Sequence, residues 1–150
     1  MIPIKKYKRN TLLFLNILLL LVLMTAACAV NNVDEEGKIL EMYAQSMRAF
    51  AHEDLRGVMK NISKDFRSSF ESQQNYEEVS EFRRLFILNN SNVSIDFRDI
   101  NIEVNNSKAI VKLKVYIHTD QIETNWAEID TLRKKRGTWE IVSWNILGGF

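Results

Sequence analysis

The hydrophobic period of this 150-residue chain changes near Asn92, and that change limits what the chain can fold into. Between residues 38 and 88 the apolar side chains recur every three or four positions, as on the buried face of an amphipathic helix. After Asn92 they alternate with polar side chains, as in half-buried strands. Helices followed by consecutive strands predict an α+β domain with an antiparallel sheet.

Three helices are expected before the change of period. The first covers residues 38–51, and its apolar face carries Ile39, Tyr43, Met47 and Phe50. A short second helix follows Asp54, which is a typical helix-capping residue. A third begins at Asn75, where Glu78 three positions on gives the pattern of a capping box. Between the last two, residues 65–70 alternate and predict a short strand.

Four long strands are expected after the change of period, connected as a meander. They cover residues 93–104, with a bulge at Asp99, and then residues 109–119, 124–133 and 138–146. In the strand at 124–133, Ala127 and Ile129 are expected to face the core. Glu128 and Asp130 alternate with them and are therefore expected to face outward.

The order of these elements resembles the nuclear transport factor 2-like superfamily. The resemblance rests on four segments: "ILEMYAQSMRAFAHEDLRGVMKNISKDF", "NYEEVSEF", "NSKAIVKLKV" and the closing hairpin "LRKKRGTWEIVSWN". It covers nearly all of residues 36–146 and implies a curved antiparallel sheet that forms a cone around a long N-terminal helix. The superfamily includes ketosteroid isomerase and polyketide cyclases, but one fold hosts many activities, so the resemblance indicates fold more than function.

The N-terminus has the pattern of a bacterial lipoprotein signal peptide. A basic head, "KKYKR", precedes a strongly apolar stretch from Leu12 to Met24, and the small residues "TAA" then precede Cys28. The pattern predicts a signal peptide at 1–27, a lipidated Cys28 with a tether at 28–37, and a domain at 38–150. The thiol of Cys28 is expected to carry a diacylglyceryl group with acyl chains of the palmitate kind. Two such chains bind a membrane stably, whereas a single chain binds only marginally.

Two other interpretations of the N-terminus remain open. Residues 11–30 are long enough for a retained transmembrane helix. Ordinary cleavage near Ala27 or Ala29 is the third possibility. All three interpretations place the domain outside the cytoplasm, because the basic head stays inside. The lipoprotein interpretation places it on a membrane of the bacterial cell envelope.

Charge and cysteine content exclude some partners. Removing residues 1–27 takes four basic residues away, which leaves 20 − 4 = 16 Lys and Arg against 19 Asp and Glu, a net charge of −3. This balance argues against nucleic acid as a partner. The basic run "RKKR" at 133–136 is expected to be a solvated hairpin turn. Cys28 is the only cysteine, so no disulfide links two parts of the domain.

No motif in the sequence predicts a catalytic, metal or cofactor site. There is no histidine–carboxylate cluster at metal-ligand spacing and no glycine-rich phosphate loop. We therefore expect a cell-envelope lipoprotein with a non-catalytic domain that binds a ligand or a protein. The alternative is a small-molecule isomerase or cyclase-like enzyme that uses the cone cavity, with Tyr43 as its candidate residue.

Two surfaces are candidates for binding. A cavity for a small apolar ligand could be lined by Tyr43, Met47, Phe82, Phe86 and Trp139, although apolar residues at helical spacing are also typical of plain core. The convex face of the sheet is expected to carry the aromatic side chains Tyr116, Trp126 and Trp144. Such a face would suit a second copy of the chain or an envelope protein, unless twist of the sheet buries these residues.

Overall fold

The computed structural model describes residues 34–68 and 74–149. The proposed signal peptide, Cys28 and the first part of the tether lie outside the described residues. Within the described ranges, no helix is long and apolar enough to span a membrane. The fold below belongs to the unit Glu36–Phe150.

Within the described residues, three helices precede the sheet. The first is helical from residue 34 to 51, so its described part begins four residues before the expected start. Helix α2 covers Leu55–Met59 and α3 covers Tyr76–Asn89. The predicted capping box is confirmed: the backbone N–H of Glu78 donates to Asn75 Oδ1 over 3.1 Å, and that of Asn75 donates to Glu78 Oε2 over 2.8 Å.

Four antiparallel strands follow in the order β1-β2-β3-β4. Their bounds are β1 Ser94–Asn105, β2 Lys108–His118, β3 Glu123–Lys135 and β4 Thr138–Gly149. The expected bulge in the first strand lies between Arg98 and Asn101, where Asp99 takes a positive φ of 51°. The expected strand at 65–70 is wrong for its described part, residues 65–68. There the chain makes only an isolated bridge between Arg67 and Asn75.

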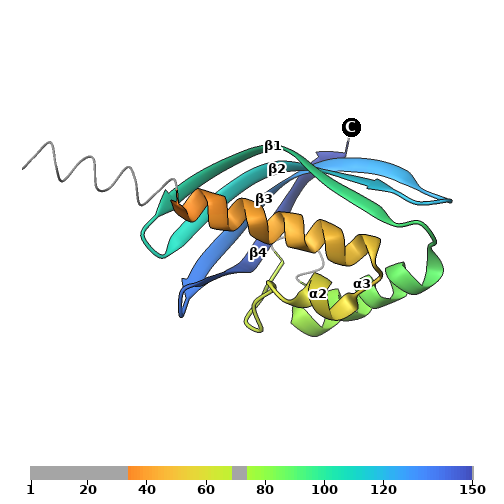
Figure 1. The fold of residues 1–150 in the computed structure, drawn as a ribbon, viewed down its shortest axis with the longest axis horizontal. Coiled ribbons are helices and arrows are strands. Elements are labelled where there is room, and N and C mark those ends of the chain that lie inside the picture. The colour runs from red at the N-terminus through yellow and green to blue at the C-terminus, as the bar shows by residue number, and fades with distance from the viewer. Residues whose placement is uncertain (1–33, 69–73, 150) are drawn as a thin grey trace, which may run out of the picture. The chain divides into compact units, whose positions relative to one another are not determined.

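The curved sheet arches over the first helix, and the helices lie on one side of it (Figure 1). We call the helix-facing side the inner face and the opposite side the outer face. The α+β cone predicted from the sequence is therefore confirmed. Every residue of the described core lies between Ile39 and Ile141, so the unit from Glu36 onward contains a complete hydrophobic core.

Phe66 is the largest fully buried side chain of this core. It lies in the loop after α2, and its ring centroid is 4.3 Å from that of Trp144 on β4. The loop itself is bonded to the same strand, because the N–H of Ser63 donates to Ile141 O over 2.9 Å. Phe66 therefore fastens the helical half of the domain to the last strand.

Phe66→Ala is expected to reduce the free energy of unfolding by about 3–5 kcal/mol, because it leaves a cavity that the surrounding rings fill only in part. Denaturant titration of the full chain, followed by circular dichroism, measures this change. Leu88→Ala on α3 is the matched control, since Leu88 is 66% exposed and its loss should change stability by less than about 0.5 kcal/mol. Equal effects of the two substitutions would contradict this packing.

Candidate functional site

Tyr43 and Asp130 form a hydrogen-bonded pair in the interior, between the first helix and β3. The Tyr43 hydroxyl donates to Asp130 Oδ2 over 2.5 Å. The two residues are only 2% and 1% exposed. No N–H or O–H group of the described residues donates to the other carboxyl oxygen, Asp130 Oδ1. A buried acceptor without a donor is costly, so this carboxyl group needs a further explanation.

Glu128 supplies that explanation. It precedes Asp130 by two positions on the same face of β3, and its charge raises the pKa of Asp130. Two neighbouring carboxylates repel each other, which favours a proton on one of them. The Nε1–H of Trp126, two positions earlier again, donates to Glu128 Oε2 over 2.7 Å. Along the inner face of β3, the indole of Trp126 is therefore followed by the carboxyl group of Glu128 and then by that of Asp130.

Burial places that proton on Asp130. Burial raises the pKa of Asp130 well above its usual range, and the neighbouring Glu128 carboxylate adds to the rise. Burial also raises the pKa of Glu128, although its hydrogen bond from Trp126 opposes the rise. The Tyr43 pKa is raised well above its usual value by burial and by Asp130. These shifts favour a neutral Tyr43 and a neutral Asp130.

Arg83 on α3 brings a positive charge to the same region. Its side chain is half-buried, and its Nη1 donates to Val58 O over 3.0 Å. The guanidinium carbon is 5.1 Å from the ring centroid of Trp144 and 5.5 Å from that of Phe50. Burial lowers the pKa of Arg83 to about 10, and the neighbouring Glu128 and Asp130 oppose this shift. Arg83 is therefore still cationic at neutral pH.

Taken together, these groups form what we call the inner cluster: Tyr43, Arg83, Trp126, Glu128, Asp130 and Trp144. Arg83, Glu128 and the two tryptophans are half-buried, whereas the Tyr43–Asp130 pair lies behind them. Chemically, the cluster offers a cation, an ionisable carboxyl group backed by a neutral acid, and two indole rings. It can bind a polar group on an apolar molecule, and it can give or take one proton.

The expected outward placement of Glu128 and Asp130 is wrong. In β3 the residues that face the helices are Trp126, Glu128, Asp130 and Leu132, because they pair with the inward-facing residues of β2 such as Val111 and Val115. Sequence reasoning chose the phase that puts Ala127 and Ile129 inside. Leu132 favours the opposite phase, because it is an apolar residue on the same face as Asp130 and it is fully buried.

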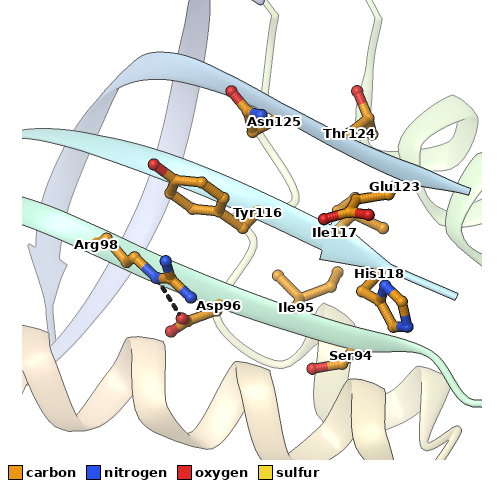
Figure 2. Close-up of a pocket in the computed structure, with 10 residues that line it drawn as sticks. All are labelled: Ser94, Ile95, Asp96, Arg98, Tyr116, Ile117, His118, Glu123, Thr124 and Asn125. Carbon is orange, nitrogen blue, oxygen red and sulfur yellow. Dashed lines mark hydrogen bonds and ion pairs between the residues drawn. The ribbon is translucent and has the colours of Figure 1, made fainter. Parts of the chain in front are cut away.

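The predicted grouping of Tyr116, Trp126 and Trp144 on one convex face is also wrong. Trp126 faces inward with Glu128. Trp144 does so because β4 carries an extra residue, Val142, between the partners of Thr131 and Leu132. This bulge reverses the alternation after Ile141. Tyr116 alone of the three lies on the outer face, beside Arg98 and Asn125 (Figure 2).

The five residues proposed to line a cavity do not lie together in the same environment. Tyr43 belongs to the inner cluster, and Met47 is half-buried on the same helix. Phe86 is half-buried against the core, but its neighbour Phe82 is 62% exposed. Trp139 is buried in the core, with the Lys134 ammonium 5.9 Å from its ring centroid.

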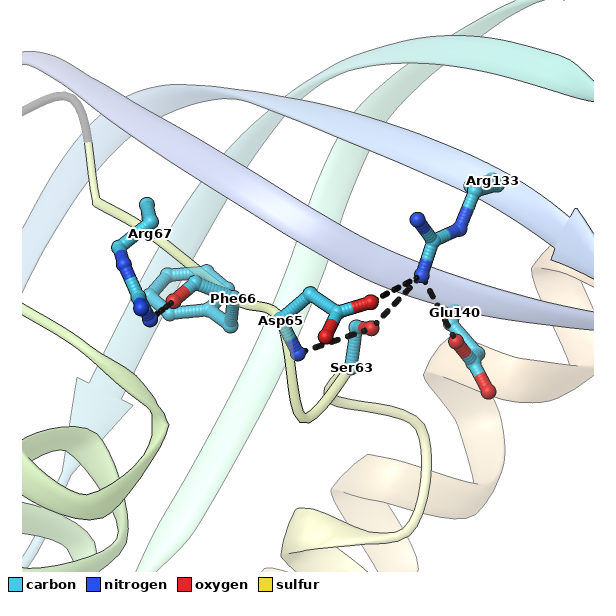
Figure 3. Close-up of polar contacts among 6 residues, drawn as sticks. All are labelled: Ser63, Asp65, Phe66, Arg67, Arg133 and Glu140. Atoms are coloured by element: carbon cyan, nitrogen blue, oxygen red, sulfur yellow. Dashed lines mark hydrogen bonds and ion pairs between the residues drawn. The ribbon is translucent and has the colours of Figure 1, made fainter.

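A second polar group, around Arg133, holds a loop in place. Arg133 Nη2 donates to Ser63 Oγ over 3.2 Å and to Asp65 Oδ2 over 3.0 Å, and it lies 3.6 Å from Glu140 Oε2 (Figure 3). The hydrogen bond from Arg133 lowers the pKa of Asp65. The first residue of the "RKKR" run therefore binds the loop after α2, while Arg136 and Gly137 take the positive φ values of the hairpin turn.

Within residues 34–68 and 74–149, no group of three or more His, Cys, Asp or Glu side chains is arranged to hold a metal ion. The inner cluster has two carboxyl groups, and its remaining polar groups are donors or weak ligands.

Comparison with solved structures identifies the fold. The chain aligns with Bdellovibrio bacteriovorus Bd1075 at a TM-score of 0.67 and 12% identity, over 75% of this chain and 39% of that one. It aligns with an NTF2-like protein of unknown function from Pseudomonas putida at a TM-score of 0.66 and 10% identity, over 76% of this chain and 86% of that one. It aligns with a Novosphingobium aromaticivorans protein provisionally named scytalone dehydratase at a TM-score of 0.66 and 14% identity, over 79% of this chain and 88% of that one.

These similarities define a protein with the nuclear transport factor 2-like fold. No family model and no curated protein matches the sequence. The chain spans less than half the length of Bd1075. At identities this low, the similarities establish the fold and leave the function to be argued from the inner cluster.

Because Asp130 binds its proton more tightly in the folded than in the unfolded chain, it makes stability depend on pH. Its contribution is complete below the unfolded pKa of 3.8 and is lost as the pH rises toward the raised folded value. Between about pH 4 and pH 7, the wild-type free energy of unfolding should therefore fall relative to that of Asp130→Asn. Denaturant titrations at several pH values measure the difference.

Asp99→Asn provides a control with the opposite sign. The ion pair with Lys114 lowers the pKa of Asp99, so its contribution is present above the unfolded pKa and is lost as the pH falls. Relative to this variant, the wild type should gain stability only as the pH rises to about 4, and the difference between the two should stay constant from about pH 4 to pH 7. A difference curve for Asp130→Asn that is flat, or that rises like this control, would show that Asp130 is ionised in the folded protein.

Proposed function

We propose that this protein is a bacterial cell-envelope lipoprotein, anchored through Cys28, whose domain binds a small molecule at the inner cluster. One observation carries the proposed binding function: the half-buried Arg83 and Glu128 lie beside the rings of Trp126 and Trp144. Charged groups are rarely kept in such a place unless a partner uses them. A second copy or an envelope protein remains the alternative occupant.

The chemistry of the cluster indicates the kind of ligand. The indole rings offer a flat apolar contact. The guanidinium of Arg83 offers donors for a carbonyl or hydroxyl oxygen, and its charge is already countered by Glu128. The expected ligand is therefore a small, mainly apolar molecule with one or two polar oxygens and no net charge.

A small-molecule isomerase or cyclase-like enzyme is the second candidate, and one observation favours it. Burial and the charge of Glu128 raise the pKa of Asp130, against the lowering effect of its hydrogen bond from Tyr43, so a neutral acid lies next to Glu128. A carboxyl group in that position can accept a proton from a bound molecule and return it at another atom. Two proteins of similar fold carry provisional dehydratase names.

Binding at the inner cluster should be visible by native mass spectrometry of the full chain released from detergent micelles. We expect a reproducible extra mass of small-molecule size in the wild type. Arg83→Gln should lose it, because the substitution removes the cation beside the indole rings. Arg84→Gln should keep it, since Arg84 is exposed on the same helix and paired with Glu81.

Tryptophan fluorescence gives a second readout, because all three tryptophans of the chain face inward. Saturable quenching by an apolar ligand panel should weaken about tenfold in Arg83→Gln. Flat titrations together with no extra mass would refute the binding function. Conversion of a bound molecule into an isomer, lost in Glu128→Gln, would establish the enzyme instead.

Cys28→Ser tests the anchor. The wild type should incorporate a labelled fatty acid and partition into the detergent phase, because acyl chains on Cys28 bury apolar surface. The variant should take up no label. If both proteins stay in the membrane and neither is labelled, the retained helix at 11–30 is the anchor. If both appear free in the medium, ordinary cleavage is correct.

A further inference from the structure

A groove of about 560 Å³ lies on the outer face of the sheet, across β1, β2 and β3. This volume is within the range of small-molecule sites. Most of its lining side chains belong to two neighbouring cross-strand rows (Figure 2). One row is Asp96, Tyr116 and Asn125, and the next is Ser94, His118 and Glu123. The groove is on the opposite side of the sheet from the inner cluster.

The aromatic ring at the centre of the groove is held in place by its neighbours. The guanidinium carbon of Arg98 is 4.4 Å from the ring centroid of Tyr116. Arg98 is fixed in turn, because its Nε donates to Asp96 Oδ2 over 2.6 Å. The three side chains stand on paired strands whose backbones are themselves hydrogen-bonded. A ligand would therefore meet a platform that is already ordered, which lowers the entropy lost on binding.

The charges of the groove select against anions. Asp96 and Glu123 are negative and Arg98 is positive, so with a neutral His118 the balance is 1 − 2 = −1. Arg98 is already engaged by Asp96 and by the ring of Tyr116. A phosphate or a nucleic acid would therefore meet net repulsion. A neutral ligand that offers hydroxyl groups meets no such penalty.

We propose that this groove binds a neutral saccharide. A sugar ring has an apolar C–H face and a rim of hydroxyl groups that both donate and accept. The face of the Tyr116 ring opposite Arg98 matches this apolar face. The Asn125 amide, the Glu123 carboxylate and the His118 imidazole together supply donors and acceptors for the rim. Neighbouring strands of a sheet lie about 4.8 Å apart. Adjacent side chains of one row therefore have a spacing comparable with the width of one sugar ring.

Saturation-transfer difference NMR tests this proposal on the full chain. The protein is kept in a detergent without a sugar headgroup, and the probes are maltotriose and tri-N-acetylchitotriose at millimolar concentration. We expect transfer from the protein to the ring protons of at least one probe. Tyr116→Thr and Asn125→Ala should weaken binding about tenfold or more. Threonine is chosen because it keeps the strand preference of the position.

Two further variants separate this groove from other surfaces. Lys112→Ala removes an exposed outer-face side chain on β2 and should leave binding unchanged. Arg83→Gln alters the inner cluster and should also leave it unchanged. Tryptophan fluorescence should not respond, because the tryptophans lie on the inner face.

The proposal is overturned by any of three results. The first is no transfer to either probe. The second is transfer that survives both Tyr116→Thr and Asn125→Ala, which would mean non-specific contact. The third is transfer abolished by Arg83→Gln, which would place the sugar at the inner cluster. Spermidine is included as a cationic probe. Binding of spermidine but not of the saccharides would show that the groove takes an amine as its ligand and not a saccharide.

Discussion

The hydrogen bond between Tyr43 and Asp130 joins the first helix to β3 at a point that water does not reach. Each partner alone would be a costly buried polar group. Their pairing therefore fixes two things together: which side of the helix faces the sheet, and which residues of β3 face the helix. A slip of β3 by one position would turn Asp130 outward and leave the tyrosine hydroxyl without its acceptor. The curved sheet and the helix are held in one relative arrangement by this requirement as well as by apolar packing.

The same constraint explains why a neutral acid is stable in the interior. Burial favours the neutral form of Asp130, and its Oδ2 accepts a hydrogen bond from the Tyr43 hydroxyl, so no full charge lies at the deepest position. The remaining charges, on Glu128 and Arg83, lie nearer the surface and oppose each other. The charged groups therefore lie nearer the surface and the neutral groups lie deeper, as expected where desolvation is the dominant cost. The accessible end of this arrangement is where a ligand would make contact.

The fold was predictable from the sequence because it depends on periodicity, which is local. The change of period at Asn92, the capping box at Asn75 and the bulge at Asp99 all appear in the structure. The phase of β3 was not predictable in the same way. Both of its faces carry apolar residues, Trp126 and Leu132 on one and Ala127 and Ile129 on the other. Only the partner across the strand, such as Val111 opposite Asp130, decides between them.

The candidate site inherited this limit. Tyr43 was identified, because its helix shows a clear apolar stripe. Its partners were missed because acids inside a sheet contradict the usual alternation, and because the bulge at Val142 that turns Trp144 inward leaves no simple signal.

Strand β3 also relates the two faces to each other. Asn125 points into the outer groove, and Trp126, its neighbour along the chain, points into the inner cluster. Successive side chains of a strand alternate, so a single register sets both positions. The extra residues that adjust the β3–β4 pairing, Val142 and Leu147, are both on β4. β3 pairs with β2 without interruption from Glu123 to Arg133. In the pairings that β3 makes, the extra residues are therefore confined to β4, which lines no part of the outer groove, and β3, which serves both faces, remains regular.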